Sequence, residues 1–210
     1  MVPARALDRV SVFSSLNVNG GMVQVTQKRE DDIFVELIFY WSPYLTFELK
    51  ITYMQTGLLH LHNLLRWIIF ILLLVSIFKA YSGWKGKKTF SAGDAKIWLF
   101  TMIASHITLL LGLYQWLMGR YGLLTFDLPE GSSRMKDPFI RFFQVEHPVS
   151  MLLAILFITL GRGMAKKQLA DTDKYRKAFI YFILGLILIL AAVPWPFRGE
   201  VIGRPLFPGM

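Results

Sequence analysis

The stretch WIIFILLLVSIF (Trp67–Phe78) decides the fold, because it is an apolar run interrupted by a single polar residue, Ser76. Extended back to Gly57, the run reaches the roughly 20 mostly apolar residues that an α-helix needs to cross a bilayer. Three further stretches of the chain have a similar length and character. The sequence therefore predicts an all-α, integral membrane, four-helix up-down bundle with a non-membrane N-terminal segment, its helices at residues 57–78, 97–118, 139–160 and 178–195.

The composition of the chain agrees with this class. Of the 210 residues, 54% are hydrophobic, and the mean hydropathy is +0.46. The sequence contains no cysteine, which excludes disulfides, thiolate metal sites, iron–sulfur clusters and covalently attached haem within this chain. The net charge of +9 does not indicate nucleic-acid binding, because the basic residues gather between the apolar stretches.

The basic residues also predict an orientation, because lysine and arginine are retained on the cytoplasmic side of a membrane. Loops one and three are therefore expected in the cytoplasm of a bacterial inner membrane, and both termini of this multi-pass chain outside. Binding of anionic lipid headgroups is the alternative role of these loops. Loops one and three carry Lys79, Lys85, Lys87, Lys88, Lys96, Arg162, Lys166, Lys167, Lys174, Arg176 and Lys177, and the other side carries Arg120, Arg134, Lys136, Arg141, Arg198 and Arg204.

Residues 1–53 differ in character from the rest of the chain. A polar stretch, NVNGGMVQVTQKREDD, is followed at residues 33–53 by aromatic residues mixed with charges and a proline, and the order of regions typical of a signal peptide is missing. Met54 stands just before the first predicted helix. We therefore expect residues 1–53 to be a poorly structured extension upstream of a natural start, and residues 54–210 to be the four-helix transmembrane domain. A peripheral segment on the outer membrane face is the alternative.

All four histidines, His60, His62, His106 and His147, fall in or at the mouth of apolar segments, where histidine is costly and usually functional. In the motif LLHLHNLLRW (residues 58–67), His62 and Arg66 are four residues apart and share a helix face. An arginine at this depth is predicted to be a fixed cation for a bound anion, such as a haem propionate or a quinone oxygen. The alternatives are snorkelling, or pairing with Glu146 or Asn63.

The order of the helices selects a histidine pair. In an up-down bundle the first and third helices are diagonal across the core, so His62 and His147 can face each other at similar depth. The fourth predicted helix has no histidine to pair with His106. The predicted metal ligands are therefore His62 and His147, with His60 and His106 in reserve. The alternatives are a packed, carbonyl-bonded His106 and an interfacial His147 beside Pro148 in an early helical turn.

The motifs LLHLHNLLRW, SHITLLLGLYQW and FFQVEHP resemble a group of small bacterial four-helix membrane proteins filed as cytochrome b-like, by analogy with b561-type cytochromes. The resemblance covers the chain from Met54 onward. It implies a non-covalent haem b held by paired histidines and a role in membrane electron transfer, with His62, His106 and His147 as candidate ligands. A typical b561 core has two histidine pairs on four helices. The fourth predicted helix here has no histidine, so the resemblance does not extend to a second haem.

These observations predict a membrane-bound, b-type cytochrome-like electron-transfer protein or redox-complex subunit. Haem b would lie between the first and third helices, with Arg66 at a propionate and Trp67 at the ring edge. The expected partners are the lipid bilayer, other respiratory or redox membrane subunits and a quinone, and no nucleic acid. The alternative is a cofactor-free structural or accessory membrane subunit. A transporter or proton-relay protein is disfavoured, because no acidic residue lies in the middle of a predicted helix.

Overall fold

The computed structural model describes residues 30–128 and 130–207, with side chains from residue 50 onward. The chain divides into two compact units, Met1–Tyr53 and Met54–Met210. In the first unit, the described residues 30–53 are helical and belong to α1 (Glu30–Lys85), where the sequence predicted a poorly structured or peripheral extension. Residues 1–29, with most of the polar stretch, lie outside the described part of the chain.

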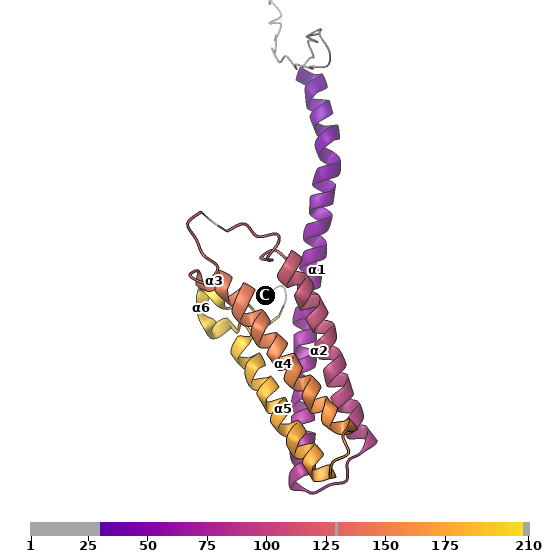
Figure 1. Ribbon diagram of the computed structural model, residues 1–210. Helices are drawn as coiled ribbons and strands as arrows, with labels where there is room; N and C mark the ends of the chain where they lie inside the picture. Colours follow the sequence, from indigo (N-terminus) through magenta and orange to yellow (C-terminus); the bar gives the residue numbers. More distant parts are fainter. Residues whose placement is uncertain (1–29, 129, 208–210) are drawn as a thin grey trace, which may run out of the picture. The chain divides into compact units, whose positions relative to one another are not determined.

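The second unit is a bundle of long helices, in which a long loop, residues 119–137, joins α2 (Ala92–Met118) to the third span (Figure 1). It contains α1 from Met54 onward, and two short helices, α3 (Pro138–Arg141) and α6 (Gly199–Ile202), lie near one end. The other long helices are α2 (Ala92–Met118), α4 (His147–Gly163) and α5 (Asp171–Ala192). In the described part of the chain, four helical spans are long and apolar enough to cross a membrane, namely Lys50–Lys85, Ala92–Met118, Pro138–Lys166 and Asp171–Ala192. The predicted all-α membrane bundle is therefore confirmed, and the chain is a multi-pass membrane protein.

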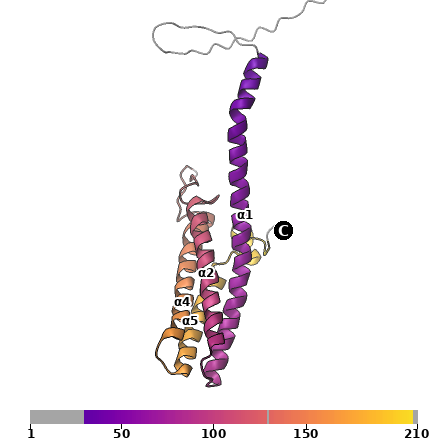
Figure 2. The same ribbon diagram turned by 90° about the vertical axis from the view of Figure 1, so that its right-hand side faces the viewer.

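Side-chain contacts define the order of the helices around the bundle. The hydroxyls of Ser76 in α1 and Thr101 in α2 are 2.8 Å apart, and the rings of Trp84 in α1 and Phe179 in α5 are 5.8 Å apart. Helix α4 packs against both α2 and α5 (Figures 1 and 2). Helices α1 and α4 are therefore diagonal across the core, which places the first and third spans as an up-down topology requires.

The long helices begin earlier than the apolar runs indicate, because polar residues form their first turns. Helix α2 begins at Ala92 rather than at residue 97, and the Ser91 side chain caps it by accepting the backbone N–H of Asp94 at 3.1 Å. Helix α5 begins at Asp171 rather than at residue 178. It ends at Ala192 rather than at residue 195, because Val193 precedes a proline and takes an extended conformation.

The third span is not one regular helix. Helix α3 leads into a π-helical turn, Phe142–Glu146, and α4 follows directly from His147. The backbone N–H of His147 bonds to the carbonyl of Phe142, five residues earlier, where a regular α-helix would bond four residues earlier. Pro148 accounts for this widening, because its ring clashes with the carbonyl four residues before it and it has no N–H to offer.

The interior of the bundle is closely packed around aromatic and aliphatic side chains. Trp98, Phe182, Leu73 and Ile158 are fully buried. At Gly161 of α4, an added Cβ would lie 2.6 Å from the Phe182 ring of α5, so this close approach of the two helices requires glycine. The packed interior fixes the helix faces that carry the polar clusters described next.

Candidate functional site

Two histidine rings meet between the diagonal helices. The ring centroids of His62 in α1 and His147 at the start of α4 are 6.5 Å apart, and the ring planes are inclined by 61°. Two imidazoles that bind one metal ion from opposite sides, with metal–nitrogen bonds of about 2 Å, place their centroids about 6 Å apart. We call His62 and His147 the histidine pair. The separation of the two ring centroids is close to that of two axial ligands of one metal.

His147 has a fixed ring orientation. Its Nδ1 lies 2.8 Å from the carbonyl oxygen of Ala192 in the last turn of α5. A carbonyl oxygen only accepts, so Nδ1 carries the proton and donates it, and the neutral ring keeps its lone pair on Nε2. A metal-binding histidine commonly has this arrangement, with one nitrogen bound to a backbone carbonyl and the other free to coordinate.

His62 faces α2 at a position without a side chain. An added Cβ at Gly112 would lie 3.4 Å from His62 Cε1, which is a tight contact. Among the described residues, the buried Nδ1 atom of His62 has no hydrogen-bond partner. Buried polar atoms are nearly always paired, so this nitrogen has an unused capacity to bind.

Arg66 contacts the C-terminal segment, a partner that the sequence analysis did not identify. Its Nη2 donates to the carbonyl oxygen of Leu206 at 2.7 Å, and the indole N–H of Trp67 donates to the same oxygen at 3.1 Å. The Trp67 ring also stacks on Phe207, with centroids 5.6 Å apart. Arg66 Nε is buried and without a partner in the part of the chain that the structure describes. The carboxylate of Glu146, one of the proposed partners of Arg66, is instead 2.7 Å from Arg141.

The two reserve histidines lie apart from the pair. His60 is exposed and lines a surface hollow of about 490 Å³, together with Leu61, Leu64, Trp67 and Phe207. His106 is exposed, and its Nδ1 lies 2.8 Å from the carbonyl of Met102 in its own helix. The carbonyl bond agrees with the packed, carbonyl-bonded alternative given for His106, but the ring is exposed rather than packed. The structure brings together His62 and His147 and leaves the ligand role of each as a prediction.

Gln115 is a further residue that the sequence analysis did not single out as a site. Its side-chain nitrogen is buried and has no hydrogen-bond partner among the residues described. Gln115 follows Gly112 by three positions on α2. Two other side chains in the described ranges contain buried unpaired nitrogens, Trp98 and Arg162. A buried glutamine in an apolar helix is visible in the sequence as a costly residue, and that cost is the signal that could have identified it.

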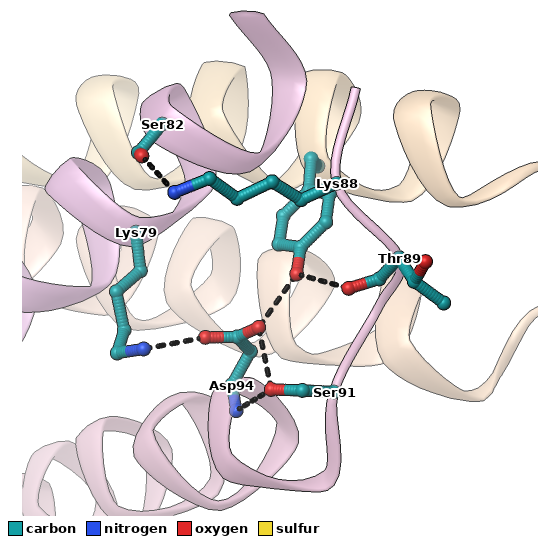
Figure 3. A network of polar contacts seen from close by, with 7 residues as sticks. Lys79, Ser82, Lys88, Thr89, Ser91 and Asp94 are labelled. Atoms are coloured by element: carbon teal, nitrogen blue, oxygen red, sulfur yellow. Dashed lines mark hydrogen bonds and ion pairs between the residues drawn. The ribbon is translucent and has the colours of Figure 1, made fainter. Parts of the chain in front are cut away.

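A second polar cluster joins α1, α2 and α5 far from the histidine pair (Figure 3). Asp94, which is 7% exposed, accepts from Lys79 Nζ at 2.7 Å, from Tyr175 Oη at 2.5 Å and from Ser91 Oγ at 2.7 Å. We call these four residues the Asp94 cluster. The cluster could not be predicted from the sequence, because Tyr175 is 81 residues away from Asp94 and no local motif connects them.

The chemistry available to the histidine pair follows from its two nitrogens. Within the described ranges, no three histidine, aspartate or glutamate side chains gather in a group that could hold a metal ion. Two axial imidazoles are sufficient for a haem, because the macrocycle supplies the other four ligands of the iron. The two imidazoles are therefore of the number and kind that a bis-histidine haem takes from a protein.

Comparisons with known proteins give no family for the chain. No protein-family model, no curated protein and no solved structure matches it. The resemblance to cytochrome b-like membrane proteins therefore stays a prediction that depends on the quoted motifs.

Proposed function

We propose that the chain is a membrane-bound b-type cytochrome-like protein that transfers electrons, alone or as a subunit of a redox complex. The observation that carries the proposal is the histidine pair, with a ring separation of 6.5 Å between two diagonal membrane helices. A bound haem b would supply a one-electron iron couple, and bis-histidine ligation leaves no open iron position for oxygen chemistry.

The side chains around the pair support this role. His147 would be held in one orientation by the Ala192 carbonyl, so that Nε2 is presented without a rearrangement of the ring. Arg66 lies four residues after His62 on the same helix face and keeps an unpaired Nε among the described residues, so its positive charge is available to a propionate.

The test is the spectrum of the purified, detergent-solubilised protein, produced with haem supplied during expression. We expect dithionite-reduced minus oxidised spectra to show the bands of a low-spin b-type haem. His62→Ala and His147→Ala should each remove these bands. His106→Ala is the matched control, because His106 is exposed and bonded to its own helix, and it should leave them unchanged.

The outcomes separate the classes of function. Bands that survive both His62→Ala and His147→Ala would place the haem on other ligands. A protein without bands, in spite of haem supply, would contradict the cytochrome and favour the cofactor-free accessory subunit, in which histidines bond to carbonyls as His147 and His106 do.

The proposal includes a location and partners. The chain would lie in a bacterial inner membrane with loops one and three in the cytoplasm, in contact with redox subunits and a quinone. Because the chain has no cysteine, single cysteines at Lys87 and Ser133 can be labelled with a membrane-impermeant maleimide in intact spheroplasts. We expect labelling at position 133 and protection at position 87, and the reverse pattern would invert the orientation.

A further inference from the structure

We infer that Trp116 of α2 is a positioning residue for His147, because it holds the π-helical turn that directly precedes this histidine. The redox consequence of this inference rests on the proposed function, but the geometric part does not.

The turn leaves one backbone carbonyl without its regular helical donor. In a regular α-helix the N–H of residue 148 would bond to the carbonyl of Gln144, but proline has no N–H. Instead, the indole N–H of Trp116 donates to the Gln144 carbonyl at 2.8 Å. A side chain of α2 thus replaces the backbone donor that Pro148 lacks.

The side chain of Gln144 fastens the same turn from two further directions. It is buried, with 2% exposure, and its Nε2 donates to the carbonyl of Tyr121 at 2.9 Å. Its Oε1 accepts from Arg134. Gln144 is therefore bound to α2, to the segment after α2 and to the segment before α3. The turn cannot rotate without breaking contacts to all three.

One face of α2 supports both members of the histidine pair. Gly112 and Trp116 are four residues apart and share this face. Gly112 admits the His62 ring, and Trp116 holds the carbonyl three residues before His147. A π turn contains one more residue than an α turn, which corresponds to about 100° of rotation about the helix axis. Loss of the turn would therefore redirect His147 relative to His62.

The variant Trp116→Phe tests the inference, because it removes the indole N–H and keeps an aromatic ring. Trp195→Phe is the matched control, since the Trp195 indole also donates to a backbone carbonyl, that of Leu190, at 2.8 Å, but not to the π turn. In haem-loaded protein, the ferric electron paramagnetic resonance signal depends on the angle between the two axial rings. We expect Trp116→Phe to shift this signal and Trp195→Phe to leave it unchanged.

A second readout uses Cu²⁺ on haem-free protein, with His60 and His106 replaced by glutamine so that only the histidine pair remains. Imidazole nitrogens are good Cu²⁺ ligands, and two of them give a distinct paramagnetic resonance signature. We expect Trp116→Phe to weaken Cu²⁺ binding about 10–100-fold, the usual effect of removing support behind a metal ligand, while Trp195→Phe does not.

A third variant covers the case in which Trp116→Phe fails to fold. Pro148→Ala restores the missing N–H and removes the ring, so it favours a regular helix and should change both signals in a folded protein. Unchanged signals in Trp116→Phe and Pro148→Ala would overturn the inference. So would the absence of a two-imidazole Cu²⁺ signal in the background protein, because the rings would then not converge. Absence of haem bands with normal Cu²⁺ behaviour would overturn the proposed function alone.

Discussion

The Asp94 cluster and the histidine pair are both polar groups within membrane-spanning helices, but they differ in how completely they are bonded. Both carboxylate oxygens of Asp94 have partners within 2.7 Å. In the described part of the chain, the Nδ1 atom of His62, and the Nε atom of Arg66 beside it, have no hydrogen-bond partner. Lys79 and His62 are also about 25 Å apart along α1. The comparison indicates that a completed cluster stabilises the helices, whereas an incomplete one has the capacity to hold a ligand.

The largest effect is expected from Asp94→Ala. This substitution removes the acceptor of both Lys79 and Tyr175 inside the bundle, and loss of one member of a buried ion pair costs about 3–5 kcal/mol of unfolding free energy. Because the Lys79 side chain is 38% exposed and can turn to water, we expect a value near the lower limit. Unfolding in detergent, followed by circular dichroism, measures it.

The control for this variant is Asp173→Ala, an exposed carboxylate in the first turn of α5. Its effect should stay within about 1 kcal/mol, the contribution of an exposed carboxylate in the first turn of a helix. Equal effects of the two variants would show that the Asp94 cluster does not stabilise the bundle.

Tyr175→Phe should have the next largest effect. The Tyr175 hydroxyl is 2.5 Å from Asp94 Oδ2, and a hydrogen bond to a charged group contributes about 1.5–3 kcal/mol. The ring itself stays in place, close to Gly83, so packing is conserved. Tyr81→Phe, at a residue that is 46% exposed, is the comparison variant in the same unfolding assay and should be nearly neutral. A neutral Tyr175→Phe would contradict the bond.

A smaller loss is expected from Ser76→Ala. The Ser76 and Thr101 hydroxyls join α1 to α2 at 2.8 Å, but hydrogen bonds between membrane helices contribute only about 0.6 kcal/mol on average. Ser82→Ala, which removes an exposed contact to Lys88, serves as the control. A loss comparable to that of Asp94→Ala would mean that neutral bonds, rather than the charged cluster, dominate the contact of α1 with α2.

Gln115→Leu should have the smallest effect, and it provides the sharpest test of the comparison. The Gln115 side-chain nitrogen is buried and unpaired among the described residues, so its replacement by an apolar side chain loses no bond. In haem-free protein we expect no loss of unfolding free energy, or a small gain. A loss of unfolding free energy above about 1 kcal/mol would show that the Gln115 side chain is hydrogen-bonded, and so would contradict the contrast with the Asp94 cluster.

The sequence predicted the four long helices, but only some of the contacts between them. Apolar runs revealed four spans, because hydrocarbon selects for length and hydropathy, but the polar first turns of α2 and α5 carry no such signal. Helix order, the similar depth of the two residues and the lack of a histidine in the fourth helix predicted that His62 and His147 face each other, and their ring centroids are 6.5 Å apart. The partner of Arg66 could not be predicted, because Leu206 contributes a backbone carbonyl, which any residue would offer. The π turn was foreseeable from Pro148, but not its bond to Trp116.

The bond between Arg66 and the Leu206 carbonyl connects residues 140 positions apart, and this has a consequence for the assembly of the protein. A ribosome adding roughly 5–20 residues per second needs about 7–28 s to proceed from one residue to the other. During this interval the first helix is made while the acceptor for its arginine does not yet exist. Water or lipid headgroups must solvate the guanidinium until then, so translation sets the time at which this end of the bundle can close.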